Sequence, residues 1–156
     1  MTAREVALRA LVACEQQGAW SDGFLKKTLR SAGLDSRDAA LATRLCFGVL
    51  QNQLLLDDYL GKLSTVKLEK MEPAICNILR LGAYQVLSLD RVPDHAAVSE
   101  AVDMARKSSR NPRSAGLVNG VLRSLVRQKD SLELPKDPAV RYSHPQWLYQ
   151  AFCQRL

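Results

Sequence analysis

The sequence lacks the patterns that build membrane spans, metal sites and nucleotide pockets. No uninterrupted apolar run approaches the roughly 20 residues that cross a bilayer, and the first residues lack the basic-then-apolar order of a signal peptide. No C-x-x-C pair or Cys/His cluster is present, which argues against zinc or redox motifs. Neither G-x-G-x-x-G nor G-x-x-x-x-G-K-[ST] occurs. We therefore expect a cytoplasmic protein with no membrane partner, and no metal or cofactor bound within these residues.

Residues suited to catalysis are also scarce. The two histidines are His95, beside Asp94, and His144, and neither has a nucleophile placed with it in the sequence. Asp57 and Asp58 are adjacent and point different ways on a helix, which indicates solvated charge rather than a carboxylate pair. The scattered cysteines are expected to be reduced and mostly buried, so the residues alone indicate a non-catalytic module. These cysteines are Cys14, Cys46, Cys76 and Cys153.

What the chain has in abundance is leucine and alanine. These two account for 43 of the 156 residues, whereas valine, isoleucine and threonine together account for 18. Leucine and alanine lose little rotamer freedom in a helix, while β-branched residues fit strands better. The composition therefore predicts an all-α fold, and the length suits about one domain.

Apolar spacing and end signals predict a compact bundle of about six or seven helices. Thr2 and Glu5 have the spacing of a capping box, and Gly18 is a natural stop. Tyr84 is expected at the rim of a buried stripe. Gly120 is interpreted as lying in the middle of a helix, at a close contact with a neighbour. The expected helices are 3–17, 23–32, 36–63 with a bend near 51–53, one starting at Pro73, one from Pro93–Asp94 to the Asn111–Pro112 break, and 112–128.

The composition changes after Lys129. Residues 130–145 contain three prolines and no helical period, which predicts an extended linker after a domain at 1–129. Residues 146–156 resume an apolar helical pattern. We expect this segment to be the first helix of a following region that continues beyond Leu156; the alternative is a C-terminal helix that packs back on the bundle.

Positive charge is concentrated in one part of the chain. Residues 104–129 hold seven lysines and arginines and no acidic residue, while the rest has 15 basic and 16 acidic residues. Such asymmetry indicates an anionic partner, most commonly a nucleic acid, although a solvated basic face would have the same composition. Six residues are the candidate RNA contacts, four of them flanking the Asn111–Pro112 turn. They are Arg4, Arg9, Arg106, Lys107, Arg110 and Arg113.

Four stretches together resemble the NusB family, an all-helical RNA-binding fold. They are AREVALRALVACEQQG at 3–18, LCFGVLQNQLLLDDYL at 45–60, ILRLGAYQVLSLDRVPDHAAVSEAVDMARK at 78–107 and LVNGVLRSLVR at 117–127. In that family the basic start of the first helix contacts RNA, and Arg4 matches the arginine of its A-R-E stretch.

The segment with RYSHPQWL resembles the join between a NusB-like domain and the catalytic domain of bacterial 16S rRNA cytosine-5 methyltransferases. This resemblance implies a parent enzyme that uses S-adenosylmethionine and a catalytic cysteine, both beyond Leu156. Cys153 is not that nucleophile, because it precedes the catalytic fold. The expected partners are 16S ribosomal RNA and the downstream methyltransferase domain.

Three functions remain open from the sequence. The first is a non-catalytic RNA-docking domain of the methyltransferase. The second is an intramolecular scaffold that holds the catalytic domain with little RNA contact. The third is a stand-alone transcription antitermination factor of the NusB type.

Overall fold

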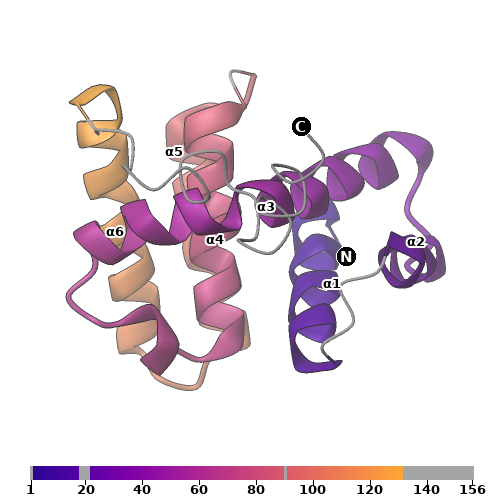
Figure 1. The fold of residues 1–156 in the computed structure, drawn as a ribbon, viewed down its shortest axis with the longest axis horizontal. Helices are drawn as coiled ribbons and strands as arrows, with labels where there is room; N and C mark the ends of the chain where they lie inside the picture. The colour runs from indigo at the N-terminus through magenta and orange to yellow at the C-terminus, as the bar shows by residue number, and fades with distance from the viewer. Residues whose placement is uncertain (1, 18–21, 90, 132–156) are drawn as a thin grey trace, which may run out of the picture.

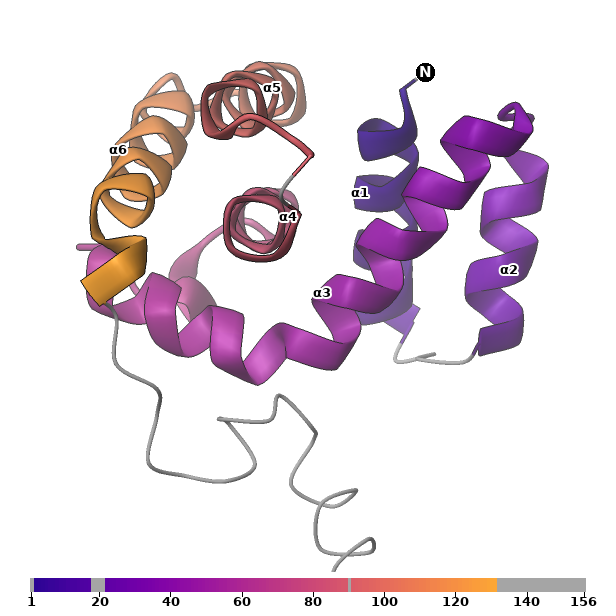
Figure 2. The same cartoon turned by 90° about the horizontal axis from the view of Figure 1, so that it is seen from above.

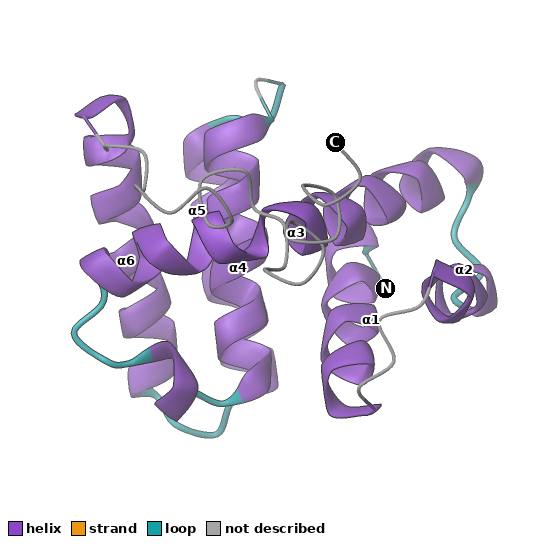
Figure 3. Cartoon of the chain, in the orientation of Figure 1, coloured by secondary structure: helices purple, strands orange, loops and turns teal. Residues whose placement is uncertain are grey.

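The structure, a computed structural model, describes residues 2–17, 22–89 and 91–131. Every regular element in these ranges is a helix, which confirms the all-α expectation (Figure 3). Two short 3₁₀ turns, Leu68–Lys70 and Lys129–Ser131, accompany the six α-helices. The six are α1 (Ala3–Gln17), α2 (Asp22–Ser31), α3 (Ser36–Leu63), α4 (Pro73–Ser88), α5 (Asp94–Ser108) and α6 (Arg113–Gln128).

Local end signals explain where the helices begin and end. The backbone N–H of Glu5 donates to Thr2 Oγ1 at 3.2 Å, as a capping box requires, although Thr2 Oγ1 itself donates to the Glu5 carboxylate. Asp35 caps α3 by accepting from the N–H of Asp38 at 2.8 Å. Gly33 follows α2 at φ 68°, a conformation that glycine adopts without a Cβ penalty.

The central helix of the bundle is α4. Figure 2 shows α4 end-on, with α1, α3, α5 and α6 around it. Every residue from Ile75 to Val86 is buried, so this helix has no solvent face. Tyr84 is therefore buried, at 8% exposure, and the expectation of a rim position was wrong. A one-sided apolar stripe was the wrong pattern to expect of a helix that is covered all round.

The longest helix, α3, runs unbroken from Ser36 to Leu63 and curves around α4 (Figures 1 and 2). Asn52 Nδ2 donates to the Gly48 carbonyl at 2.8 Å, and a side chain that enters the backbone hydrogen-bond ladder favours bending. By length and composition α3 is apolar enough to cross a membrane. In the structure one side of α3 packs on α1 and α4.

The close helix contacts lie at glycines other than the one expected. A Cβ at Gly48 of α3 would overlap the ring of Tyr84, and a Cβ at Gly82 of α4 would press on Leu122 of α6. Gly120 is in the middle of α6, as expected, but it is exposed and a Cβ there would meet nothing within 4 Å. The expected close contact at Gly120 was therefore wrong.

The expected linker at 130–145 and helix at 146–156 lie outside the described residues, apart from Asp130 and Ser131 in the last 3₁₀ turn. His144 and Cys153 fall in the same undescribed part.

Candidate nucleic-acid interface

The α5–α6 turn carries four of the six candidate RNA contacts. Arg106 and Lys107 occupy the last turn of α5, Arg110 lies in the connection, and Arg113 is the first residue of α6. Asn111 holds this turn, because its Oδ1 accepts from the N–H of Arg113 at 3.0 Å. We call Arg106, Lys107, Arg110 and Arg113 the cationic corner.

The positive charges of the corner form only exposed ion pairs or none with the described carboxylates. Arg106 lies 3.5 Å from Asp103, and Lys107 Nζ lies 4.0 Å from Glu5, with side chains 68% and 70% exposed. Exposed pairs of this kind contribute about 0–1 kcal/mol, so a phosphate can replace the carboxylate at little cost. Arg110 and Arg113 are exposed, and neither pairs with a carboxylate of the described ranges. The corner therefore presents cations to solvent on one short stretch of surface.

The structure separates the two candidate arginines of α1. Arg4 Nε lies 2.7 Å from both Glu100 Oε2 and Gln85 Oε1, and its side chain is only 16% exposed. Arg9 is exposed and lies one helical turn after Glu5, the residue that approaches Lys107. Arg9 therefore lies on the same face of α1 as Glu5, which is next to Lys107 of the corner. Arg4 instead joins α1 to α4 and α5.

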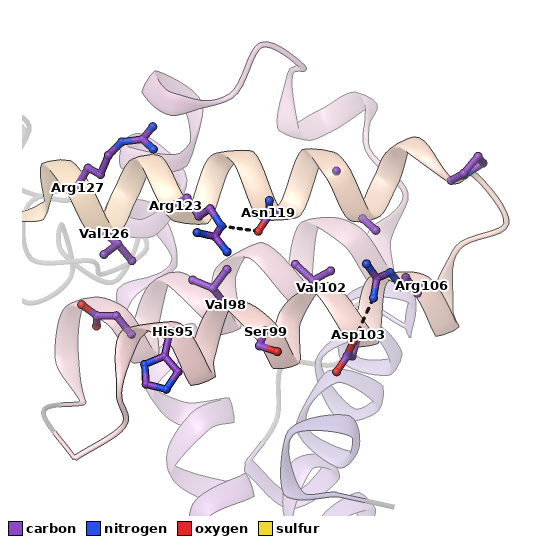
Figure 4. A pocket seen from close by; sticks show the side chains of 14 residues that line it. His95, Val98, Ser99, Val102, Asp103, Arg106, Asn119, Arg123, Val126 and Arg127 are labelled. Atoms are coloured by element: carbon purple, nitrogen blue, oxygen red, sulfur yellow. Dashed lines mark hydrogen bonds and ion pairs between the residues drawn. The ribbon is translucent and has the colours of Figure 1, made fainter.

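A groove of about 880 Å³, which was not expected from the sequence, lies between α5 and α6. Figure 4 shows Val98 and Val102 of α5 directed toward α6, with Arg123 and Arg127 on the facing helix. Arg123 Nε donates to Asn119 Oδ1 at 2.8 Å, and Arg127 Nη2 donates to Ser124 Oγ at 3.1 Å. Both arginines therefore have neutral partners and keep their charge uncompensated.

The acidic residues of the groove are already paired. Asp94 accepts from Lys129 at 2.9 Å, and Asp103 faces Arg106. His95 is exposed near the start of α5, as expected for a surface or helix-end histidine. The groove consequently has a positive α6 wall and a nearly neutral α5 wall.

Comparison with known proteins agrees with this architecture. The family model described as "NusB family" matches residues 1–127. The chain belongs to the NusB family. The solved structure of T. maritima NusB superposes with a TM-score of 0.74 at 23% identity, covering 81% of this chain and 89% of that one. This likeness supports the fold alone.

The relatives of this NusB-family chain in sequence are longer proteins. The probable ribosomal RNA small subunit methyltransferase B of Bacillus subtilis is 40% identical over 150 residues, which are 93% of this chain and 33% of the relative. Ribosomal RNA small subunit methyltransferase B of Erwinia tasmaniensis is 34% identical over 148 residues, 94% of this chain and 34% of the relative. The chain thus spans about a third of the length of these curated relatives.

A partly buried ion pair between α3 and α4 of this NusB-family bundle was not expected. Arg80 of α4, 7% exposed, donates through Nε and Nη2 to the two carboxylate oxygens of Asp57 at 2.8 and 2.9 Å. Its Nη1 donates to Asn77, and Asn77 Nδ2 donates to Glu15 of α1. The interpretation of Asp57 as solvated charge was therefore wrong, because its partner lies 23 residues away on another helix. Burial lowers the pKa of the Arg80 guanidinium, but the hydrogen bonds that Arg80 donates to Asp57 and the negative charges of Asp57 and Glu15 together outweigh burial and raise that pKa.

The described cysteines pack in the interior, as expected. Cys14, Cys46 and Cys76 are buried and unpaired. Burial, with a smaller contribution from Cys14, raises the pKa of the Cys46 thiol to about 12. Cys46 Sγ also donates to the Ala7 carbonyl at 3.6 Å, which needs the protonated form. Nucleophilic cysteines need a lowered pKa and access to substrate, so these three thiols are structural.

Proposed function

We propose that this chain is the RNA-docking part of a bacterial 16S ribosomal RNA cytosine-5 methyltransferase and leaves catalysis to the remainder of that enzyme. The observation that carries the proposal is the cationic corner, where four exposed cations are held together by one structured turn. Supporting it, the curated relatives are named as small-subunit rRNA methyltransferases, and the chain covers about a third of their length. We expect the protein to act in the cytoplasm.

The corner's chemistry suits phosphate contacts better than base reading. Arginine and lysine neutralise phosphates and release condensed counterions, which gives affinity with little sequence preference. No aromatic side chain belongs to the corner, so stacking of unpaired bases is not the expected mode there. Arg9 extends the surface on the α1 side, and Arg4 acts mainly as a joint between helices.

The cofactor of such an enzyme does not fit the described residues. S-adenosylmethionine would supply the methyl group, but these residues form helices and loops without a strand and glycine-rich loop to cradle it. In this proposal the described residues contribute RNA contacts to the enzyme.

The test is the salt dependence of binding to a 16S rRNA fragment. Replacing Arg106, Lys107, Arg110 and Arg113 with Ala should weaken binding and reduce the slope of log K against log salt by about 3, because each phosphate contact contributes about 0.7–0.9. Fluorescence anisotropy over a salt series measures both quantities.

The matched control removes four exposed arginines elsewhere: Arg30, Arg37, Arg44 and Arg91. Both variants lose the same net charge, so only a localised site distinguishes them. Equal losses in the two variants would mean diffuse attraction, and unchanged binding by the corner variant would favour the scaffold alternative. Either result contradicts the proposal.

A further inference from the structure

The groove between α5 and α6 has an apolar floor that the RNA-docking proposal does not use. Val98 is buried, and Val102, Ala115 and Val126 are partly buried along the two helices. The lining runs from Asp94 to Arg106 on α5, which at about 1.5 Å per residue gives a length near 18 Å. The groove's volume of about 880 Å³ lies within the range of sites that bury a ligand.

Gly116 keeps one part of this groove open. It lies in the first half of α6, lines the groove, and is exposed. A Cβ at this position would meet nothing within 4 Å, so no neighbouring side chain occupies the space. A larger side chain at residue 116 would therefore project into the groove without disturbing the bundle.

The charges around the floor favour an acidic occupant on one side. Arg123 and Arg127 are one helical turn apart on α6 and have only neutral hydrogen-bond partners, Asn119 and Ser124. Opposite them, Asp94 and Asp103 are each paired with a cation. A bound molecule with carboxylates on the side that faces α6 would compensate the charges of Arg123 and Arg127. On the α5 side it would meet no unpaired carboxylate of the groove lining.

The residue types of the groove floor favour a peptide over RNA as the bound molecule. Single-stranded RNA binds where aromatic faces stack its bases, whereas the apolar part of this groove's lining is valine, alanine and proline, and His95 is the only aromatic ring among the lining residues. Branched apolar side chains instead receive the leucine or isoleucine anchors of a helix laid in a groove. A helix of about 12–14 residues matches the groove's length.

We propose that the α5–α6 groove binds an amphipathic helix of a partner protein, with its apolar face on the valine floor and an acidic edge beside Arg123 and Arg127. This surface is separate from the contacts assigned to RNA, apart from the shared edge at Arg106. The inference therefore stands or fails independently of the RNA-docking role.

The test uses a fluorescein-labelled peptide of about 14 residues with leucines at helical spacing and glutamates along one flank. Anisotropy titration of the 156-residue chain should show saturable binding of this peptide and much weaker binding of a scrambled peptide with the same composition. Gly116→Trp should weaken binding at least about tenfold by filling the groove, and Gly116→Ala should leave it unchanged. Equal affinity for the scrambled peptide, or an unchanged Gly116→Trp variant, would overturn the proposal.

Charge reversal gives the second measurement. Arg123→Glu with Arg127→Glu should weaken binding of the acidic peptide about tenfold and should strengthen binding of the same peptide with lysine in place of glutamate. The control, Arg37→Glu with Arg44→Glu on α3, makes the same change of net charge at exposed positions away from the groove and should leave both affinities unchanged.

Two outcomes would reassign the groove. Displacement of the peptide by single-stranded RNA, together with loss of RNA binding in Gly116→Trp, would make it an RNA site. A dimer in sedimentation analysis that Gly116→Trp dissociates would make it an interface with a second copy. RNA binding that persists in Gly116→Trp alongside loss of the peptide is the expected result, and it also leaves the corner's role intact.

Discussion

Arginines of this chain divide by what surrounds them rather than by where they fall along the sequence. Arg4 and Arg80 have largely buried side chains that pair with Glu100 and Asp57, and each joins three helices. Arg110 and Arg113 are exposed and have no described carboxylate beside them. Desolvation is costly for a charge without a partner, so buried arginines must be paired, whereas exposed ones stay available to an external anion.

The Arg80–Asp57 pair makes a direct prediction about stability. Arg80→Met should lower the free energy of unfolding by about 3–5 kcal/mol, because it leaves Asp57 partly buried without its bidentate partner. Urea denaturation followed by circular dichroism measures the change. The paired variant, Arg80→Met with Asp57→Leu, removes both charges and should recover a large part of the loss. If the loss of unfolding free energy in the double variant equals the sum of the losses in Arg80→Met and Asp57→Leu alone, the pair is not coupled.

At the scale of the helix, glycine has two opposite uses. Gly48 lets α3 approach the Tyr84 ring of α4, whereas Gly120 lies in an exposed part of α6 with open space around it. Alanine carries the Cβ that glycine lacks and is the better helix former by about 1 kcal/mol, so the same substitution has opposite signs at the two positions.

We therefore predict that Gly48→Ala destabilises the protein by about 1–3 kcal/mol and Gly120→Ala stabilises it by up to about 1 kcal/mol. Thermal unfolding of both variants beside the parent chain gives the comparison. A neutral Gly48→Ala would mean that the Tyr84 ring moves away without cost. A destabilising Gly120→Ala would mean that a neighbour covers that face of α6.

Helix ends were predictable because their signals are local. Thr2 and Pro73 act within a few residues of themselves, and each lies at the helix start expected from the sequence. Gly33 and Asp35 likewise lie directly beside the expected ranges 23–32 and 36–63. The burial of α4 on all sides was not predictable from its own residues. Its covering depends on which helices pack against it, and periodicity describes only one helix at a time.

For the molecule as a whole, the two surfaces differ in how far apart their residues lie along the sequence. The cationic corner was visible in the sequence because its four residues lie within eight positions of one another. The α5–α6 groove combines side chains up to 33 positions apart, such as Asp94 and Arg127, so it emerges only when the helices pair. The concentration of positive charge was therefore predictable from the sequence, whereas the apolar floor beside it was not.

The described residues contain a continuous hydrophobic core. The buried apolar side chains that the structure describes lie between Ala3 and Leu125, and the family model matches residues 1–127. A chain ending at Ser131 should therefore unfold cooperatively, with a free energy of unfolding within about 0.5 kcal/mol of the 156-residue chain. It should also keep its affinity for the 16S rRNA fragment, because the corner and Arg9 remain.

Urea denaturation and anisotropy on the two chains, side by side, measure both quantities. The truncated chain lacks Lys136, Arg141 and Arg155 but also Glu133 and Asp137, so its net charge changes by only one unit. A loss of several kcal/mol would mean that residues 132–156 pack on the bundle, which is the alternative to a linker and a following region. A loss of RNA affinity at unchanged stability would instead move part of the RNA contact beyond the corner, into residues 132–156.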